Sequence, residues 1–440
     1  MTPATPSPAQ ARRMVRARLG REPQDMLEAA VVLEAWAGLP AHRALHLGRE
    51  IAAASPTEAH PSVGRLAAPE TGHGFAVDTC SFVIAVVAIA GWAGPLTRSL
   101  GLHAVAVALT AALPVTLALQ WGLASRYLGR PAAFVHLGRR PLVLPLVAWL
   151  ALVAAPTAAF GETGALAGLL TLTWTGGAIL LRRRWSLVYV AIVLLGSAGM
   201  FAKLAAPDVV MGSAVLTTIA VTAAVHGHAG VAAGQPGRWG RALVAAAIGA
   251  GVGALLVADG SINADLGTLP ALGLLPSSLA SVWGGSHLWR FQHVIPGTLS
   301  GVPLVAGQRG LGAAPVRVLI GTVARVLVMS AALSALLVAV ARALHVEPND
   351  GTVLVGYGLL ALATLLLSLL ESLGRGRVAL LALAGGMGAE GLALAASALP
   401  AVSGGGLIVG AAVVVGLALP TAVATLGRPA TTLATTMGIR

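Results

Sequence analysis

The sequence predicts an all-α, polytopic membrane protein with about twelve transmembrane helices in two six-helix lobes, and three observations lead to this prediction. Of the 440 residues, 57% are hydrophobic and 10% are charged, whereas soluble domains carry about 25% charged residues. The apolar residues fall into stretches of about 20, the length that crosses a bilayer core. Arginine is concentrated in every second connection between these stretches, as is typical of loops on the cytoplasmic side.

Residues 1–72 precede the first apolar stretch and predict a basic cytosolic extension. They lack an early apolar core with a small-residue cleavage site, so they do not form a signal peptide. A basic run at 12–21 is followed by an amphipathic pattern over 23–36, a Gly-Leu-Pro turn and a second helical pattern over 41–54. The resulting helical hairpin is either a docking module, for a cytosolic partner or for anionic lipid headgroups, or a solvated tail that helps to fix topology.

From Phe75 onward, apolar stretches alternate with short polar connections. The first lobe covers 75–227, the second covers 241–426, and 427–440 form a cytosolic tail. The predicted spans lie near 75–94, 100–123, 141–160, 162–181, 185–205, 208–227, 241–259, 268–289, 316–341, 353–373, 378–397 and 404–426.

The charges in the connections predict the orientation of these spans. Connections after the even-numbered spans are basic, and most of the others are short and acidic or neutral. Arg98, after the first span, is the main exception. This alternation places both termini in the cytoplasm and requires an even number of spans in the cytoplasmic membrane. The basic connections contain Arg126, Arg130, Arg139, Arg140, Arg182, Arg183, Arg184, Arg238, Arg241, Arg290, Arg309, Arg317, Arg375, Arg377 and Arg428.

The eighth span and the connection after it form the central stretch of the chain, 268–326. Pro270 and Pro276 interrupt the first half of this span, and several serines make it the most polar of the predicted spans. It leaves the membrane through a basic and aromatic segment that ends at Arg290. Interrupted spans often mark binding sites in transporters.

Glu390 is the clearest polar residue inside a span. It lies within a glycine-rich segment, 385–391, well inside the eleventh span. A carboxylate at this depth is expensive unless it is paired, hydrated or protonated. Two interpretations remain: a site that binds a proton, a cation or a polar headgroup, and an interhelical hydrogen bond for which the glycines leave room.

Six further residues are candidates for the transport path. Asp78 begins the first span, where it either lines the path or satisfies a helix N-terminus. Arg325 lies about two turns into the ninth span and either binds a phosphate or pairs with a carboxylate. The complete set of candidate residues is Asp78, Gln120, Ser281, His287, Arg290, Arg325 and Glu390.

Several functional classes find no support in the sequence. The outer connections are too short to hold a catalytic domain, and there is no phosphate-binding loop of the Walker type. The single cysteine, Cys80, cannot form an internal disulfide or a cysteine metal cluster. His226 and His228 lack obvious metal-binding partners, and the arginines are not interleaved with aromatic residues as in nucleic-acid binders. We therefore expect neither enzymatic activity nor a metal, a cofactor or a nucleic-acid partner.

Three short segments resemble the multidrug/oligosaccharidyl-lipid/polysaccharide flippase superfamily, which includes polysaccharide exporters and lipid-linked oligosaccharide flippases. They are 93–102 between the first two spans, the Arg-Arg-Arg-Trp segment at 182–185, and 309–317 before the ninth span. The resemblance implies a cavity between two lobes, lined by spans one, two, seven and eight, and a lipid-linked sugar as cargo. It also implies transport by alternating access.

Two other functions stay open at this point. A small-solute or drug exporter of the major facilitator type also has two six-span lobes, although the connection at 126–140 lacks the acidic residue expected there. A membrane scaffold for a cell-envelope assembly, recruited through residues 1–72, would not transport at all.

Overall fold

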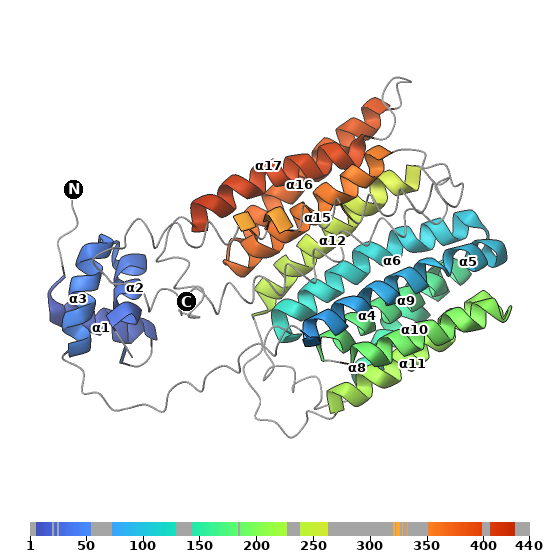
Figure 1. Ribbon diagram of the computed structural model, residues 1–440, viewed down its shortest axis with the longest axis horizontal. Coiled ribbons are helices and arrows are strands. Elements are labelled where there is room, and N and C mark those ends of the chain that lie inside the picture. Colours follow the sequence, from blue (N-terminus) through green and yellow to red (C-terminus); the bar gives the residue numbers. More distant parts are fainter. Residues whose placement is uncertain are drawn as a thin grey trace. The chain divides into compact units, whose positions relative to one another are not determined.

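In the computed structural model, most of the described residues form helices (Figure 1). The described residues are 6–19, 22–23, 26–53, 73–128, 143–183, 185–226, 238–262, 351–397 and 405–426, with 320–321, 323–325, 328 and 332. Within these ranges every regular element is a helix, in agreement with the predicted all-α class. The chain forms two compact units.

The smaller unit contains three helices near the N-terminus: α1 (Pro8–Leu19), α2 (Met26–Ala37) and α3 (Ala41–Ala53). Helices α2 and α3 occupy the two segments predicted as a hairpin, and α1 is an addition that lies on the basic run. The helices pack through small and branched residues, and Val15, Leu33 and Ile51 are almost completely buried. This apolar core explains why the extension is folded here rather than an extended tail.

The larger unit contains the apolar helices, which fall into two groups along the chain. The first group has α4 (His73–Ala90), α5 (Ala93–Leu100), α6 (Leu102–Leu123), η1 (Ala124–Leu128), α8 (Val143–Trp149), η2 (Leu150–Ala154), α9 (Ala155–Arg182), α10 (Ser186–Phe201) and α11 (Ala206–His226). The second has α12 (Trp239–Ile262), α15 (Gly351–Ser372), α16 (Gly376–Ser397) and α17 (Gly406–Leu426), the last of which belongs to this unit as far as Ala418.

Eight of the described helices are long and apolar enough to cross a membrane. All predicted spans except the eighth and ninth coincide with described helices. The predicted span 268–289 lies outside the described residues, and only a few residues of 316–341 are described. The chain is therefore a multi-pass helical membrane protein.

The third and fourth predicted spans form one continuous helical segment, Val143–Arg182, that reverses direction at Gly161. Gly161 has φ 59° and ψ −138°, a conformation that is accessible to glycine because it has no Cβ. Beyond the turn, Gly164 and Gly168 lie directly against the backbone carbonyls of Pro156 and Leu152. The π-helical element η2 is located at this contact, so the two arms of the hairpin pack backbone to backbone.

Tryptophan side chains join the helices of the first group. Trp92, which is 1% exposed, donates its indole N–H to Ser197 Oγ on α10 at 2.9 Å. Trp149 donates in the same way to Thr218 Oγ1 on α11 at 3.1 Å. Each bond satisfies the one polar atom of a large apolar side chain, so the indoles can fill the bundle core without an unpaired donor.

The two helix groups meet along a glycine-rich contact between α6 and α12. A Cβ added to Gly253 would lie 2.5 Å from Pro114 Cα, and one added to Gly122 would lie 3.3 Å from Ala246 Cβ. Gly249 packs in the same way against the carbonyl of Leu117. Small residues at such positions let membrane helices approach until their backbones touch.

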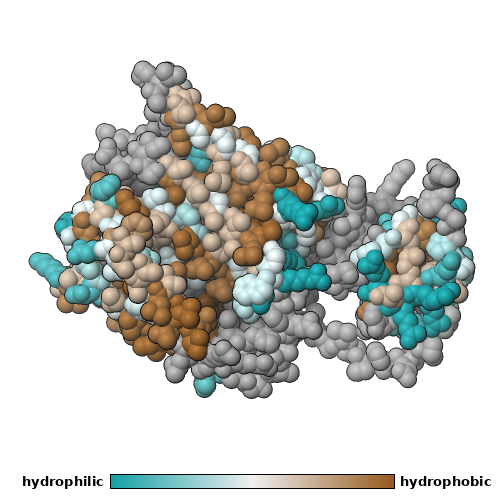
Figure 2. Space-filling model, turned by 180° about the vertical axis from the view of Figure 1, so that it is seen from behind, coloured by the Kyte–Doolittle hydropathy of each residue, from teal (hydrophilic) through white to brown (hydrophobic). Residues whose placement is uncertain are grey.

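The outward surface of the larger unit is apolar, and Figure 2 shows one face on which hydrophobic residues cover much of the helices. Large apolar side chains stand out from several helices; Phe160 is 75% exposed and Phe201 is 87% exposed. Water-soluble monomers rarely expose such wide apolar areas. Contact with lipid acyl chains explains this surface, and helices are suited to that contact because their backbone groups are bonded internally.

Candidate functional site

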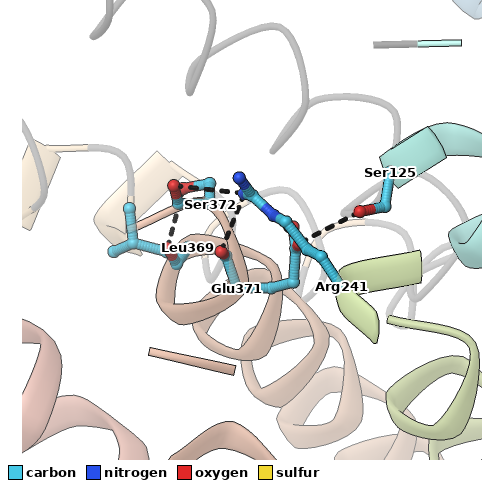
Figure 3. Close-up of polar contacts among 5 residues, drawn as sticks. All are labelled: Ser125, Arg241, Leu369, Glu371 and Ser372. Atoms are coloured by element: carbon cyan, nitrogen blue, oxygen red, sulfur yellow. Dashed lines mark hydrogen bonds and ion pairs between the residues drawn. The ribbon is translucent and has the colours of Figure 1, made fainter. Parts of the chain in front are cut away.

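Arg241, Glu371 and Ser125 form a polar cluster at one end of the larger unit (Figure 3). Arg241 lies near the start of α12, Glu371 near the end of α15, and Ser125 in η1, the continuation of α6. The sequence predicts all three segments on the cytoplasmic side, and the structure brings them into contact. The ends of α9 and α11 are at the same end of the unit, since Ile179 and Val225 pack beside Tyr127 of η1.

The charged pair in this cluster has well-aligned geometry. Arg241 Nε lies 2.7 Å from Glu371 Oε1, and Arg241 Nη2 donates to the main-chain oxygen of Glu371 at 3.0 Å. The side chains of Arg241 and Glu371 are 31% and 15% exposed. Ser125 Oγ donates to the same carboxylate oxygen at 3.3 Å, so Figure 3 shows Glu371 contacted from both helix groups. Hydrogen bonds in which donor and acceptor are both charged are stronger than those between neutral groups.

The end of α15 is shaped to present Glu371. Gly374 has φ 77°, and two main-chain bonds close the last turn: Gly374 N–H to Glu371 O at 3.0 Å, and Arg375 N–H to Leu370 O at 2.8 Å. This is a Schellman motif, in which a residue with positive φ ends the helix. The Glu371 carbonyl therefore stays oriented toward both Gly374 and Arg241.

A second contact links the two helix groups beside this cluster. The guanidinium of Arg126, in η1, lies 3.6 Å from the ring centroid of Trp239 at the start of α12. Arg126 Nε also donates to Tyr127 Oη at 2.9 Å. Stacking of a guanidinium on an indole contributes about 0.5–1 kcal/mol at exposed sites. Together with the bond from Ser125, it connects η1 to α12 and α15.

No sequence pattern predicted this cluster. Arg241 and Arg126 are predicted as topology signals, and no role is predicted for Glu371. One signal was available: Glu371 is an acidic residue next to a connection whose other charges, Arg375 and Arg377, are basic. An acid on the arginine-rich side of a membrane protein has basic neighbours with which to pair.

Glu390 occupies a second position, on α16, and is 2% exposed. Its neighbours on α17 are glycines. A Cβ added to Gly410 would lie 2.9 Å from Glu390 Cβ, and one added to Gly406 would lie 3.6 Å from Glu390 Cγ. Gly386, one turn earlier on α16, would place a Cβ 2.8 Å from the Gly410 carbonyl. The glycines thus provide the room that the glutamate side chain fills.

Gln120 lies on α6 and joins two helices of the first group. Its Nε2 donates to the main-chain oxygen of Trp174 on α9 at 3.1 Å. The side chain is half-buried. This contact gives Gln120 a packing role in the described structure, and it lies in a different helix group from Glu390.

The structure gives partial information on the remaining candidates. Asp78 is half-buried in the second turn of α4, and Arg325 has an exposed side chain. Ser281, His287 and Arg290 lie outside the described residues. Among the described residues, no group of three or more His, Cys, Asp or Glu side chains is placed to hold a metal ion.

Comparisons with protein-family models, curated proteins and solved structures give no match for this chain. The fold therefore defines a class, that of multi-pass helical membrane proteins, and the family resemblance stays a proposal.

Proposed function

We propose that this protein is a transporter that moves a lipid-linked oligosaccharide or polysaccharide precursor across the cytoplasmic membrane by alternating access. The observation that carries the proposal is the cluster of Ser125, Arg241 and Glu371. It joins the two helix groups at one end by polar contacts that can form and break. Alternating access needs such an end, closed in one state and open in another.

The contact between α6 and α12 suits this motion. It includes close approaches of glycine to alanine and proline, as between Gly253 and Pro114. Small residues have few rotamers to rearrange, so two backbones can change their crossing angle while they stay in contact. In the proposal, this contact is the pivot, and the contacts of Ser125 and Arg126 close the end nearest the cytoplasm.

The proposed architecture has twelve spans in two lobes of six, with both termini in the cytoplasm. Residues 129–142 of the first lobe, and 263–319, 333–350 and 398–404 of the second, lie outside the described residues. Among the residues predicted for the transport path, Arg290 and Arg325 are cations that suit a pyrophosphate group. Residues 1–72 form a cytosolic domain for a partner or for anionic headgroups.

Transport of a fluorescent lipid-linked oligosaccharide tests this proposal. Purified protein is placed in vesicles with a fluorescent polyprenyl-pyrophosphate oligosaccharide, and a membrane-impermeant quencher reports the fraction in the outer leaflet. We expect faster equilibration between leaflets than in protein-free vesicles. Transport of small dyes without this lipid would favour the drug exporter, and no transport of either would favour the scaffold.

Glu371→Gln tests the cluster within the same assay. It removes the charge that Arg241 and Ser125 contact, and the loss of one or two kcal/mol changes a two-state equilibrium by a factor of about 5–30. We expect transport to fall by a comparable factor. Glu162→Gln is the matched control because Glu162 is an exposed carboxylate beside the Gly161 turn. Equal transport rates for Glu371→Gln and Glu162→Gln would show that the cluster has no role in transport.

A further inference from the structure

We propose that the start of α12 binds a phospholipid with an anionic headgroup, whose phosphate is held by a group of exposed arginines. Arg238 directly precedes α12, and Arg375 and Arg377 flank Gly376, the first residue of α16. The side chains of all three arginines are exposed. They belong to the same end of the larger unit as Arg241, which lies in the first turn of α12.

Two contacts bring these arginines to one place. Arg241 pairs with Glu371 at the end of α15, with 2.7 Å between Nε and Oε1. One turn further along α12, Val244 lies against the start of α16, since a Cβ added to Gly376 would be 2.7 Å from Val244 Cγ1. The turn between α15 and α16 therefore packs on the first two turns of α12, and Arg238 lies one turn before Arg241.

Acidic residues do not balance the positive charge at this end. At the described ends of η1, α12, α15 and α16 that meet here, the acidic residue is Glu371, and Arg241 already pairs with it. Within the part of the chain that the structure describes, no ion pair joins Arg238, Arg375 or Arg377 to an acid. Guanidinium groups are weakly hydrated and match the geometry of phosphate oxygens, so a phosphate group suits the surplus charge.

The surface next to Arg238 suits a lipid better than a soluble phosphate. Trp239 and Leu243 follow along one side of α12 and are 63% and 64% exposed. Ala247 continues the same exposed side, one turn further. This apolar stripe, Trp239 to Ala247, rises about 12 Å at 1.5 Å per residue, which is most of the depth of one leaflet, about 15 Å. An acyl chain can lie on the stripe while its phosphate stays at the arginines.

Trp239 marks the boundary between the arginines and the apolar stripe. Its ring centroid lies 3.6 Å from the guanidinium of Arg126 in η1. Tryptophan is enriched where acyl chains meet headgroups, so this residue places Arg238 and Arg126 at the depth of a phospholipid phosphate. Basic sites at this depth on the cytoplasmic side, where the sequence predicts this end to be, recognise anionic headgroups.

Positive charge at this end is also what membrane topology requires. A topology signal, however, needs only the charge and acts in the same way whichever phospholipids surround the folded protein. A preference for one phospholipid is therefore the property that separates a binding site from a topology signal.

A lipid at this position has a consequence for the contact between Arg241 and Glu371. A phosphate bound by Arg238, Arg375 and Arg377 holds the start of α12 against the turn between α15 and α16. Binding should therefore favour the state in which this end is closed, because a ligand shifts a two-state equilibrium toward the state that it binds better. This effect on transport rests on the proposed function, whereas binding of the lipid does not.

Native mass spectrometry of the purified full-length protein tests lipid binding without a cargo. The protein in detergent is mixed with equal amounts of phosphatidylglycerol and phosphatidylcholine that have the same acyl chains, and the bound lipids are counted. We expect the wild type to retain phosphatidylglycerol preferentially. Arg238→Gln combined with Arg377→Gln should weaken this binding about 30-fold, equivalent to about 1 kcal/mol for each arginine. Arg98→Gln combined with Lys203→Gln is the matched control because it removes two exposed cations, before α6 and after α10, at the other end of the first helix group.

Fluorescence quenching locates the bound lipid and covers the case in which the double variant does not fold. Phosphatidylglycerol with brominated acyl chains quenches the tryptophans that it touches, and it is added at one lipid per protein. We expect the quenched fraction to fall in Trp239→Phe and to stay unchanged in Trp185→Phe. Trp185 is the matched control because it is also exposed and lies at the start of another helix, α10.

Three results would overturn the proposal: equal retention of the two lipids by the wild type, equal losses in the two double variants, or unchanged quenching in Trp239→Phe. Displacement of phosphatidylglycerol by an equal concentration of inorganic phosphate would overturn it as well, because the site would then recognise a soluble anion. None of these results depends on transport, so the proposed function can fail while the lipid site stands.

Discussion

Glu371 and Glu390 lie on successive helices of one helix group and have the same side chain, yet their surroundings differ. Glu371 is at the end of α15, 15% exposed, with Arg241 Nε at 2.7 Å. Glu390 is inside α16, 2% exposed, and faces the glycines of α17. The first environment supplies hydrogen-bond donors to the carboxylate, and the second leaves the side chain little contact with solvent. The comparison teaches that depth and neighbours, rather than residue type, set the chemistry of a carboxyl group in a membrane protein.

The largest loss of stability should come from a substitution that fills the glycine contact around Glu390. Gly410→Val places branched methyl groups where a single Cβ would already lie 2.9 Å from Glu390 Cβ. Overpacking of this kind destabilises proteins by about 1–3 kcal/mol, and we expect a clear drop in the unfolding temperature in detergent. Gly416→Val is the matched control on the same helix, since a Cβ there has no neighbour within 4 Å. Equal stability of the two variants would show that the α16–α17 contact is loosely packed.

Arg241→Ala should have the next largest effect, because it leaves Glu371 with fewer donors. Loss of one partner of a buried polar group costs about 1–3 kcal/mol, and the partial exposure of Arg241 favours the lower part of this range. The loss of stability is measured by thermal unfolding, with tryptophan fluorescence as the signal. Arg375→Ala serves as the control because Arg375 is exposed and lies four residues after Glu371, beyond Gly374. An equal loss of stability in Arg375→Ala and Arg241→Ala would show that the effect comes from losing a positive charge in general and not from the contact with Glu371.

Gln120→Leu should have the smallest effect of the three. It removes the hydrogen bond from Gln120 Nε2 to the Trp174 carbonyl and keeps a side chain of similar length. Interhelical hydrogen bonds in membranes contribute about 0.6 kcal/mol on average. Thermal unfolding should therefore change by little, and transport should be close to that of the wild type. A large loss of transport with unchanged stability would indicate that Gln120 acts in the transport path.

The sequence predicted the class of fold and most of the spans because both depend on local properties. Apolar stretches between Phe75 and Pro420 have the length of a bilayer, and the loops between them have clear charge patterns. The hairpin at Gly161 was placed correctly because a glycine followed by Glu162 separates two apolar stretches. Local patterns also predicted that Glu390 lies inside a span, because it is a charged residue in an otherwise apolar segment.

The polar cluster could not be predicted in the same way because it depends on contacts between distant parts of the chain. Ser125, Arg241 and Glu371 are brought together by the packing of α6, α12 and α15, and none of them belongs to a local motif. The length of α10 was also overestimated. Its predicted end was residue 205, but Lys203 adopts φ 60° and the helix ends at Phe201. A positive φ at a lysine has no clear signal in the sequence.

The distance between the two helix groups at the Glu371 end is the most direct test of alternating access. Spin labels are attached at Leu187→Cys, at the start of α10, and at Arg375→Cys, after α15, with Cys80 replaced by serine. Both positions are exposed, and they belong to different helix groups. Pulsed electron paramagnetic resonance in lipid nanodiscs should show two distances in the otherwise wild-type protein and a shift toward the longer one in Glu371→Gln. A single distance that is the same in both proteins would contradict the account.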